Sequence, residues 1–208
     1  MSNSVYLSRG VFNLLISSLV VAAVVLFFMA ASIFEPAQII AINPTILMIG
    51  SLIVAVGGTV MASRCESTVM QVFGFVLVPV ALGVASTLWL HSVDGQVLYE
   101  AMLMTIAATA VMAILSALFP NFFLKISGIL FMTLLVIIVI SIVGIFIAGF
   151  DFTWINALSL LVFMGLLGVD FVVARNSPPT VGAAISISVS MFIDLINIMM
   201  SITSLTDD

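Results

Sequence analysis

Long uncharged hydrophobic runs make up almost the whole chain, and a few charged residues separate one run from the next. Each run is long enough to cross about 30 Å of hydrocarbon as an α-helix, which takes roughly 20 residues. The run at residues 10–34 is too long for the apolar part of a signal peptide, and further runs follow it. The pattern predicts an all-α integral membrane protein in which residues 1–208 form one domain of seven transmembrane helices. The predicted spans are 11–34, 44–63, 68–90, 98–119, 126–149, 153–174 and 181–205.

The last predicted span differs from the others because one of its faces is polar. Asp194 lies in its middle, and the polar residues around it recur at helical spacing. They are Ser186, Ser190, Asn197, Ser201 and Ser204. A carboxylate without a partner costs a few kcal/mol or more in hydrocarbon, so this polar seam is expected to face other helices or a wet cavity rather than lipid.

A second carboxyl group, that of Asp170, lies within the preceding span. One interpretation of the two acids is structural: each is protonated or hydrogen-bonded and fixes helix packing. The other is functional, because acids inside a membrane usually mark ion or proton paths. If the two side chains meet, they cannot both ionise cheaply, and one proton is shared by the pair. Such a pair would act as a pH sensor, and when both acids ionise they suit a weakly bound hard cation such as Ca²⁺.

Chain geometry restricts how Asp170 and Asp194 can meet. Residues at one depth of an antiparallel hairpin are equidistant from its turn, and a tight turn at residues 176–179 leaves the two acids offset by about nine residues, or roughly 13 Å. Contact therefore requires either a partly non-helical stretch over residues 180–184 or a strong tilt between the two helices. The sequence leaves both open.

Composition agrees with a membrane protein and excludes several other classes. The chain is 64% hydrophobic and 6% charged, with a mean hydropathy of +1.46. A single cysteine, Cys65, and a single histidine, His91, exclude an intrachain disulfide and a four-ligand zinc site. The net charge of −5 offers no basic surface to nucleic acid. No cofactor is expected beyond Ca²⁺ as a bound or transported ion.

The few basic residues predict the orientation in the membrane. Arg9, Arg64, Lys125 and Arg175 all fall in links on one side of the predicted spans. Basic residues favour the cytoplasmic side, so the N-terminus is expected inside and the C-terminal tail, with Asp207 and Asp208, outside a cell or bacterial inner membrane.

Three short segments resemble the Bax inhibitor-1 family, and in particular its bacterial members. Residues 162–170, VFMGLLGVD, resemble the family's sixth helix, where a phenylalanine and a glycine precede an aspartate. Residues 194–198, DLINI, are similar to the Asp-Phe-Ile-Asn-Leu of its seventh helix. Residues 126–130, ISGIL, resemble the opening of its fifth helix. The resemblance extends along most of the chain, and the two aspartate motifs are its specific part.

The resemblance implies a fold of seven helices with a central seventh helix. It also implies a pH-dependent Ca²⁺ leak controlled by a paired-aspartate sensor. Carried over by position, Asp170 and Asp194 are the pair, and Arg64 is the arginine that latches onto it. Some bacterial relatives are instead linked to a membrane-anchored AAA protease, so a regulator that conducts no ions is the alternative.

An intramembrane aspartyl protease is the remaining alternative, because its catalytic dyad also consists of two acids on neighbouring helices. Those enzymes carry Gly-x-Gly-Asp at one aspartate, whereas residues 167–170 read LGVD. Seven spans are also too few for that class. We therefore expect no enzymatic activity.

Overall fold

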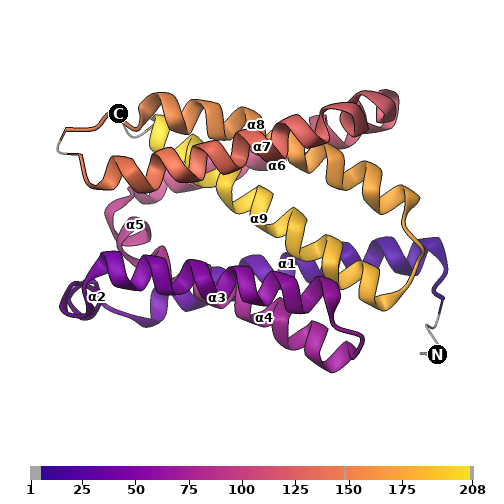
Figure 1. Ribbon diagram of the computed structural model, residues 1–208, viewed down its shortest axis with the longest axis horizontal. Coiled ribbons are helices and arrows are strands. Elements are labelled where there is room, and N and C mark those ends of the chain that lie inside the picture. The colour runs from indigo at the N-terminus through magenta and orange to yellow at the C-terminus, as the bar shows by residue number, and fades with distance from the viewer. Residues whose placement is uncertain (1–5, 148, 207–208) are drawn as a thin grey trace. The chain divides into compact units, whose positions relative to one another are not determined.

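The computed structural model describes residues 6–147 and 149–206, and this part of the chain is helical with short links (Figure 1). The helices are α1 (Arg9–Ile33), α2 (Pro36–Ile42), α3 (Pro44–Arg64), α4 (Thr68–Ala85), α5 (Thr87–Ser92), α6 (Gly95–Leu118), α7 (Pro120–Ile145), α8 (Thr153–Asn176) and α9 (Val181–Thr206). All of them except α2 and α5 are long and apolar enough to cross a membrane. The predicted all-helical membrane fold with seven spans is confirmed.

Two of the predicted boundaries are wrong. The span predicted at 68–90 is divided, because α4 ends at Ala85 and α5 starts at Thr87. At the break the Ser86 amide donates to both Leu82 and Gly83, which tightens the last turn. The span predicted at 126–149 starts earlier, at Pro120, because a proline fits the first turn of a helix, where its missing N–H is not needed. The predicted tail residues Asp207 and Asp208 lie outside the described residues.

Asn43 forms the corner between α2 and α3 and caps α3. Its side-chain oxygen accepts a hydrogen bond from the Thr45 amide at 3.0 Å, and Pro44 occupies the first turn. Its backbone has a positive φ of 73°, which asparagine tolerates better than most residues.

Replacing Asn43 with alanine is expected to lower the free energy of unfolding by about 2 kcal/mol, because the cap and the tolerance of positive φ are both lost. Replacing it with glycine keeps the backbone conformation and is expected to cost only about a few tenths of a kcal/mol. Thermal unfolding in detergent compares the two variants. Equal losses in both would show that backbone strain plays no part.

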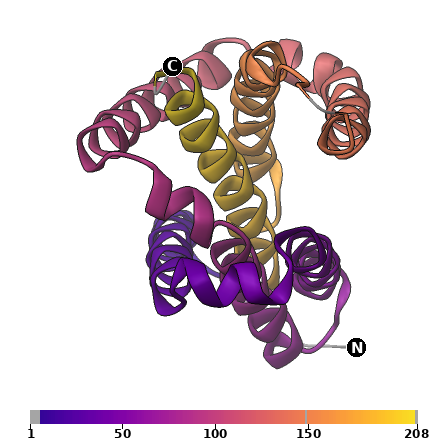
Figure 2. The same cartoon turned by 90° about the vertical axis from the view of Figure 1, so that its left-hand side faces the viewer.

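The chain divides into two compact units, which are described separately here. The first comprises residues up to Ser92 together with Ser177–Phe192. In it α4 packs against both α1 and α3, and α2 lies against α3 and α5 (Figures 1 and 2). The α3–α4 contact is close because glycines meet there: a methyl group added at Gly74 would lie 2.6 Å from the Gly58 carbonyl oxygen. The prediction of a single domain stays a prediction.

The second unit comprises Val93–Asn176 and Ile193–Asp208, and in its described part α8 packs against both α6 and α7. One cluster of buried side chains joins all three helices, and a second joins α7 and α8. One consists of Met112, Phe123 and Val172, and the other of Ile137, Ile155 and Val162. Helix α8 therefore supplies the buried residues that hold this unit together.

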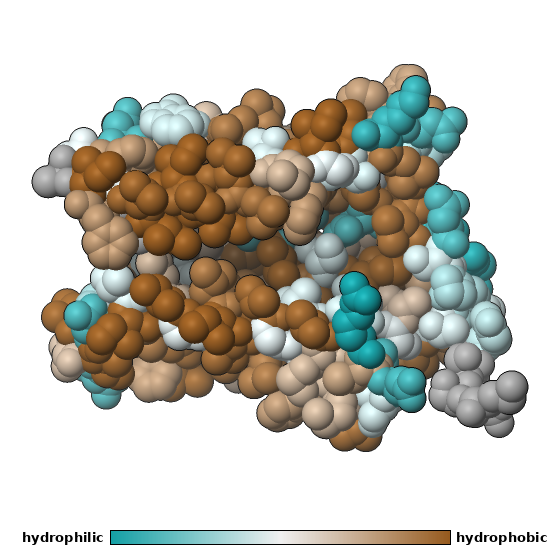
Figure 3. All heavy atoms as spheres, viewed as in Figure 1, coloured by the Kyte–Doolittle hydropathy of each residue, from teal (hydrophilic) through white to brown (hydrophobic). Residues whose placement is uncertain are grey.

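Helix α9 contributes to both units, with its division at Phe192 and Ile193. Of the residues in its most apolar window, 61% are buried, against 39% for α8 and 6% for α7. The visible surfaces of α3 and α7 are largely hydrophobic, and hydrophilic residues gather at the helix ends (Figure 3). This distribution is the one expected of helices whose outer faces contact lipid.

Candidate functional site

Asp194 lies in the part of α9 that belongs to the second unit and is almost completely buried. Its side chain is 4% exposed, and within the described residues its Oδ2 atom has no hydrogen-bond partner. Leaving a buried acceptor without a partner costs about 1–3 kcal/mol. A group retained at that cost requires an explanation other than stability.

Asp170 lies on α8 in the same unit and is partly buried. The Asp170 carboxyl group acts on Asp194 electrostatically, so the acid of α8 and the acid of α9 interact within this unit. The structure therefore brings together the two acids that the sequence singled out. Their roles as pH sensor and Ca²⁺ ligands stay predictions.

Helix tilt, rather than a break in α9, makes this interaction possible. The Ala184 amide donates to the Thr180 carbonyl at 3.0 Å, so α9 is helical from its first turn, and a non-helical stretch at residues 180–184 is excluded. The second half of α9 is instead inclined to α8 (Figure 1). The inclination removes the offset of about nine residues between the two acids that an antiparallel hairpin with parallel helix axes would impose.

Glycines on α8 allow α7 to pack closely against this helix. A methyl group added at Gly168 would overlap the Phe123 ring, and one added at Gly165 would lie 2.8 Å from a methyl carbon of Leu130. Because Phe123 also packs with Val172, this ring lies against the face of α8 that carries Gly168 and Val172. Asp170 is two residues from each of them and therefore lies on the opposite side of the helix.

Arg175 ties the end of α8 to α6, an interaction that was not predicted from the sequence. Its Nη2 atom donates to the Ala113 carbonyl at 3.0 Å and to the Ser116 hydroxyl at 3.2 Å. A signal was available, because Ser116 belongs to a row of small and hydroxyl residues on α6. Such a row is typical of close helix packing and does not identify an arginine partner.

The predicted polar seam of α9 is divided between the two units. Ser186 and Ser190 lie in the first unit and are half-buried, whereas Asn197 and Ser201 lie in the second, where Ser201 is 6% exposed. The Asn197 amide donates to the Ile193 carbonyl at 2.7 Å, and the Ser204 hydroxyl donates to Met200 at 2.9 Å. These donors are used within the helix itself, which leaves their oxygen atoms as acceptors.

Two buried hydroxyl residues of α9 lie off the predicted seam. Ser188 and Thr203 have no exposed surface, and they donate to Ala184 and Met199 respectively. Hydrogen bonds to the preceding turn let such residues occupy apolar surroundings, so polar residues of α9 are not confined to the seam.

The remaining predicted residues do not build a larger site. Arg64 is the exposed last residue of α3 in the first unit, and its role as a latch stays a prediction. Among the described residues no group of three or more His, Cys, Asp or Glu side chains is placed to hold a metal ion. A cation at Asp170 and Asp194 would therefore depend on two carboxylates, carbonyl groups and water, which is a weak site.

Seven membrane-crossing helices and an interacting acid pair inside one helical unit define a multi-pass membrane protein with an intramembrane carboxyl site. A family model described as "Inhibitor of apoptosis-promoting Bax1" matches residues 4–207, and the chain belongs to this family, the Bax inhibitor-1 family. No curated protein matches the chain significantly.

Proposed function

We propose that this protein is a pH-sensitive calcium leak channel in which Asp170 and Asp194 form the sensor. The observation that carries the proposal is the interaction of two carboxyl groups, one of them 4% exposed, within a unit of apolar helices. Acids in such surroundings are rare, and they mark proton or ion paths far more often than packing contacts.

The proposed mechanism follows from the charge of the pair. While one proton is shared, the pair carries one negative charge, and it attracts a divalent cation only weakly. When that proton leaves, two carboxylates face each other, and a divalent ion offsets their repulsion. The side-chain oxygen atoms of the polar seam on α9 would contact the ion before and after it reaches the pair. The weak site implied by two carboxylates suits a leak, since a conducted ion also has to leave its site.

Lipid, Ca²⁺ and protons are the proposed partners, and no enzymatic activity is proposed. The positions of the basic residues support a cytoplasmic N-terminus and a C-terminus outside a cell membrane. In the first unit Arg9 starts α1 and Arg64 ends α3, and in the second unit Lys125 lies near the start of α7 and Arg175 near the end of α8. If the long helices alternate in direction across the membrane, all four residues then lie at or near the cytoplasmic ends of their helices.

Purified protein in liposomes loaded with a Ca²⁺ dye tests the proposal. The parent protein is expected to release Ca²⁺ faster than protein-free liposomes, at a rate that changes between acidic and neutral pH. A rate equal to that of empty liposomes at every pH would overturn conduction. The protein would then be better described as a non-conducting regulator of a membrane-anchored protease. Protease turnover in cells that lack this protein tests that description.

Replacing Arg64 with alanine tests the proposed latch. If the guanidinium group holds a carboxylate of the pair in the closed form, its removal is expected to raise the leak at the pH where the parent leaks least. The expected rise is about tenfold, which corresponds to one charge-assisted hydrogen bond. Arg64→Lys keeps the charge and serves as the control. A leak that is unaltered in both variants would discard the latch.

A further inference from the structure

The link between α8 and α9 cannot satisfy its own backbone groups. It runs from Ser177 to Thr180 and contains Pro178 and Pro179, which have no N–H to donate. Carbonyl groups near the apolar part of a membrane require donors. The Thr180 amide donates to the Pro178 carbonyl at 2.8 Å, and the carbonyl groups of Ser177 and Pro179 still need donors from outside the link.

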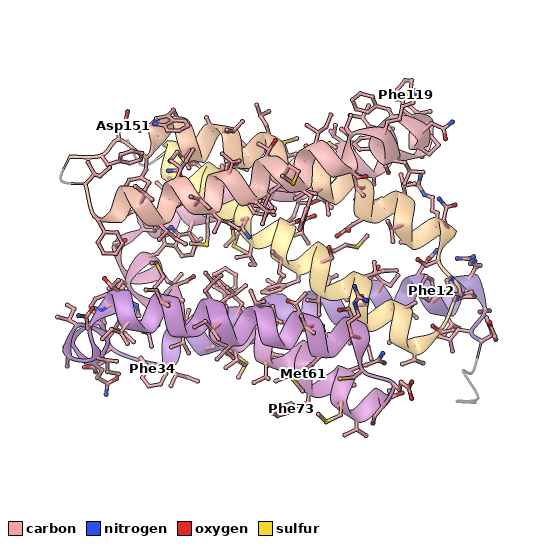
Figure 4. The ribbon with its side chains drawn as sticks, viewed as in Figure 1. Phe12, Phe34, Met61, Phe73, Phe119 and Asp151 are labelled. Carbon is pink, nitrogen blue, oxygen red and sulfur yellow. The ribbon has the colours of Figure 1, made fainter. Side chains whose placement is uncertain are left out.

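Residues at and just before the start of α1 supply those donors. The Leu7 amide donates to the Pro179 carbonyl at 2.7 Å, and Arg9 Nη1 donates to the Ser177 carbonyl at 2.9 Å. Tyr6 and Thr180 form an antiparallel β-bridge. The Arg9 guanidinium also lies 5.9 Å from the ring centre of Phe12, a fully buried residue on the first turn of α1 (Figure 4). Arg9 is therefore held in place by its own helix.

The contact between α1 and α9 continues inward from the link. The Ser188 hydroxyl reaches the Ile16 carbonyl at 3.3 Å, and the rings of Phe27 and Phe192 meet edge-on with centroids 6.2 Å apart. Ser188, Phe27 and Phe192 have no exposed surface. Residues 6–27 thus follow α9 from the link to Phe192, the last residue that α9 contributes to the first unit.

We propose that residues 6–9 form a strap that binds the start of α9 to α1, so that α1 and the first half of α9 move as one body. Asp194 lies two residues beyond Phe192 on the same uninterrupted helix. A displacement of the first half of α9 is therefore passed on to the acid, and the strap opposes that displacement. The strap would keep the leak low. This regulatory part rests on the proposed function, whereas the strap itself does not.

Cross-linking tests the strap directly. In a Cys65→Ser background, Tyr6→Cys and Thr180→Cys are expected to form a disulfide on mild oxidation, because directly opposed residues of an antiparallel pair have Cβ atoms about 4.5–5.5 Å apart. The control pair Tyr6→Cys and Ser32→Cys is separated by the length of α1, roughly 36 Å, and is expected to stay reduced. Failure of the first pair to cross-link would overturn the strap.

Releasing the strap tests its effect on α9. Leu7→Pro removes the amide donor and Arg9→Ala removes the guanidinium donor. The double variant is expected to speed maleimide labelling of Ser186→Cys, in the same background, by about tenfold, the effect of losing two ordinary hydrogen bonds. Arg9→Lys is expected to restore part of the protection. Leu14→Ala, at a position on α1 that is 67% exposed, is expected to have no effect.

The same variants in Ca²⁺-loaded liposomes separate the strap from its regulatory role. Faster labelling together with a faster leak supports both. Faster labelling with an unchanged leak keeps the strap and overturns its control of conduction. Unchanged labelling overturns the strap as a restraint on α9. If the parent protein does not leak, conduction and its regulation are both overturned, and cross-linking and labelling still decide whether the strap exists.

Discussion

Replacing either Asp170 or Asp194 with asparagine is expected to move the pH dependence of the Ca²⁺ leak toward acidic pH. In the parent, the second acid of the pair loses its proton against the charge of the first. With one acid removed, the other ionises without that repulsion. The midpoint of the leak curve is therefore expected to move to lower pH. Ca²⁺ is also expected to compete less well, because one carboxylate binds it more weakly than two.

Asp151→Asn is the matched control for these variants. Asp151 lies in the link before α8, where its carboxyl group accepts the Thr153 amide at 2.8 Å, and hydrogen bonds from Thr153 lower its pKa. Figure 4 labels it in that link. The substitution removes one acid from a helix end rather than from the pair and is expected to leave the leak curve in place. If all three variants follow the parent curve, the pair is not the sensor.

Replacing Gly74 with alanine is expected to cause a large loss of stability in the first unit. The added carbon would meet the Gly58 carbonyl oxygen at 2.6 Å, the Ala62 amide nitrogen at 2.7 Å and the Met61 Cβ at 2.7 Å. Figure 4 labels Met61 on α3 and Phe73, the neighbour of Gly74, on α4. None of these atoms ends a flexible side chain, so α3 and α4 must move apart. We expect a loss of about 1–3 kcal/mol in the free energy of unfolding.

Gly57 provides the control for this substitution on the facing helix. A methyl group added there meets nothing within 4 Å. Gly57→Ala is expected to be neutral or to stabilise α3 by up to about 1 kcal/mol, because alanine favours the helix. Thermal unfolding of both variants in detergent gives the comparison. Similar values for the two would show that α3 and α4 do not rely on close backbone approach.

Most of the helical architecture could be predicted from the sequence because a membrane imposes a minimum length on each apolar run. The helix breaks could not be predicted in the same way. Residues 84–87 are as compatible with a continuous helix as with the end of α4, and the break at Ser86 depends on its amide bonding to two carbonyls at once. The short helix α2 also lies within an uncharged run, which offers no signal of a separate element.

The acid pair was predictable because a carboxyl group in a hydrophobic run is conspicuous and costly. How the two acids meet was not predictable, since it depends on the tilt between α8 and α9. The roles of Arg9 and Arg175 were missed for a related reason. Both donate to backbone carbonyl groups far away in the chain, in Ser177 and Ala113. Every residue has a backbone carbonyl group, so the residue types at these positions do not reveal the acceptors.

Infrared spectra of the protein in lipid, recorded while the pH is raised, test the acid pair most directly. A shared proton predicts a band from one protonated carboxyl group that persists where the exposed acids of the chain are already ionised. This band should disappear when Ca²⁺ is added or the pH is raised further. Asp170→Asn and Asp194→Asn should each weaken it at that pH, and Asp151→Asn should retain it. A parent protein that lacks the band, or a band that neither substitution within the pair alters, would contradict the shared proton on which the proposed leak depends.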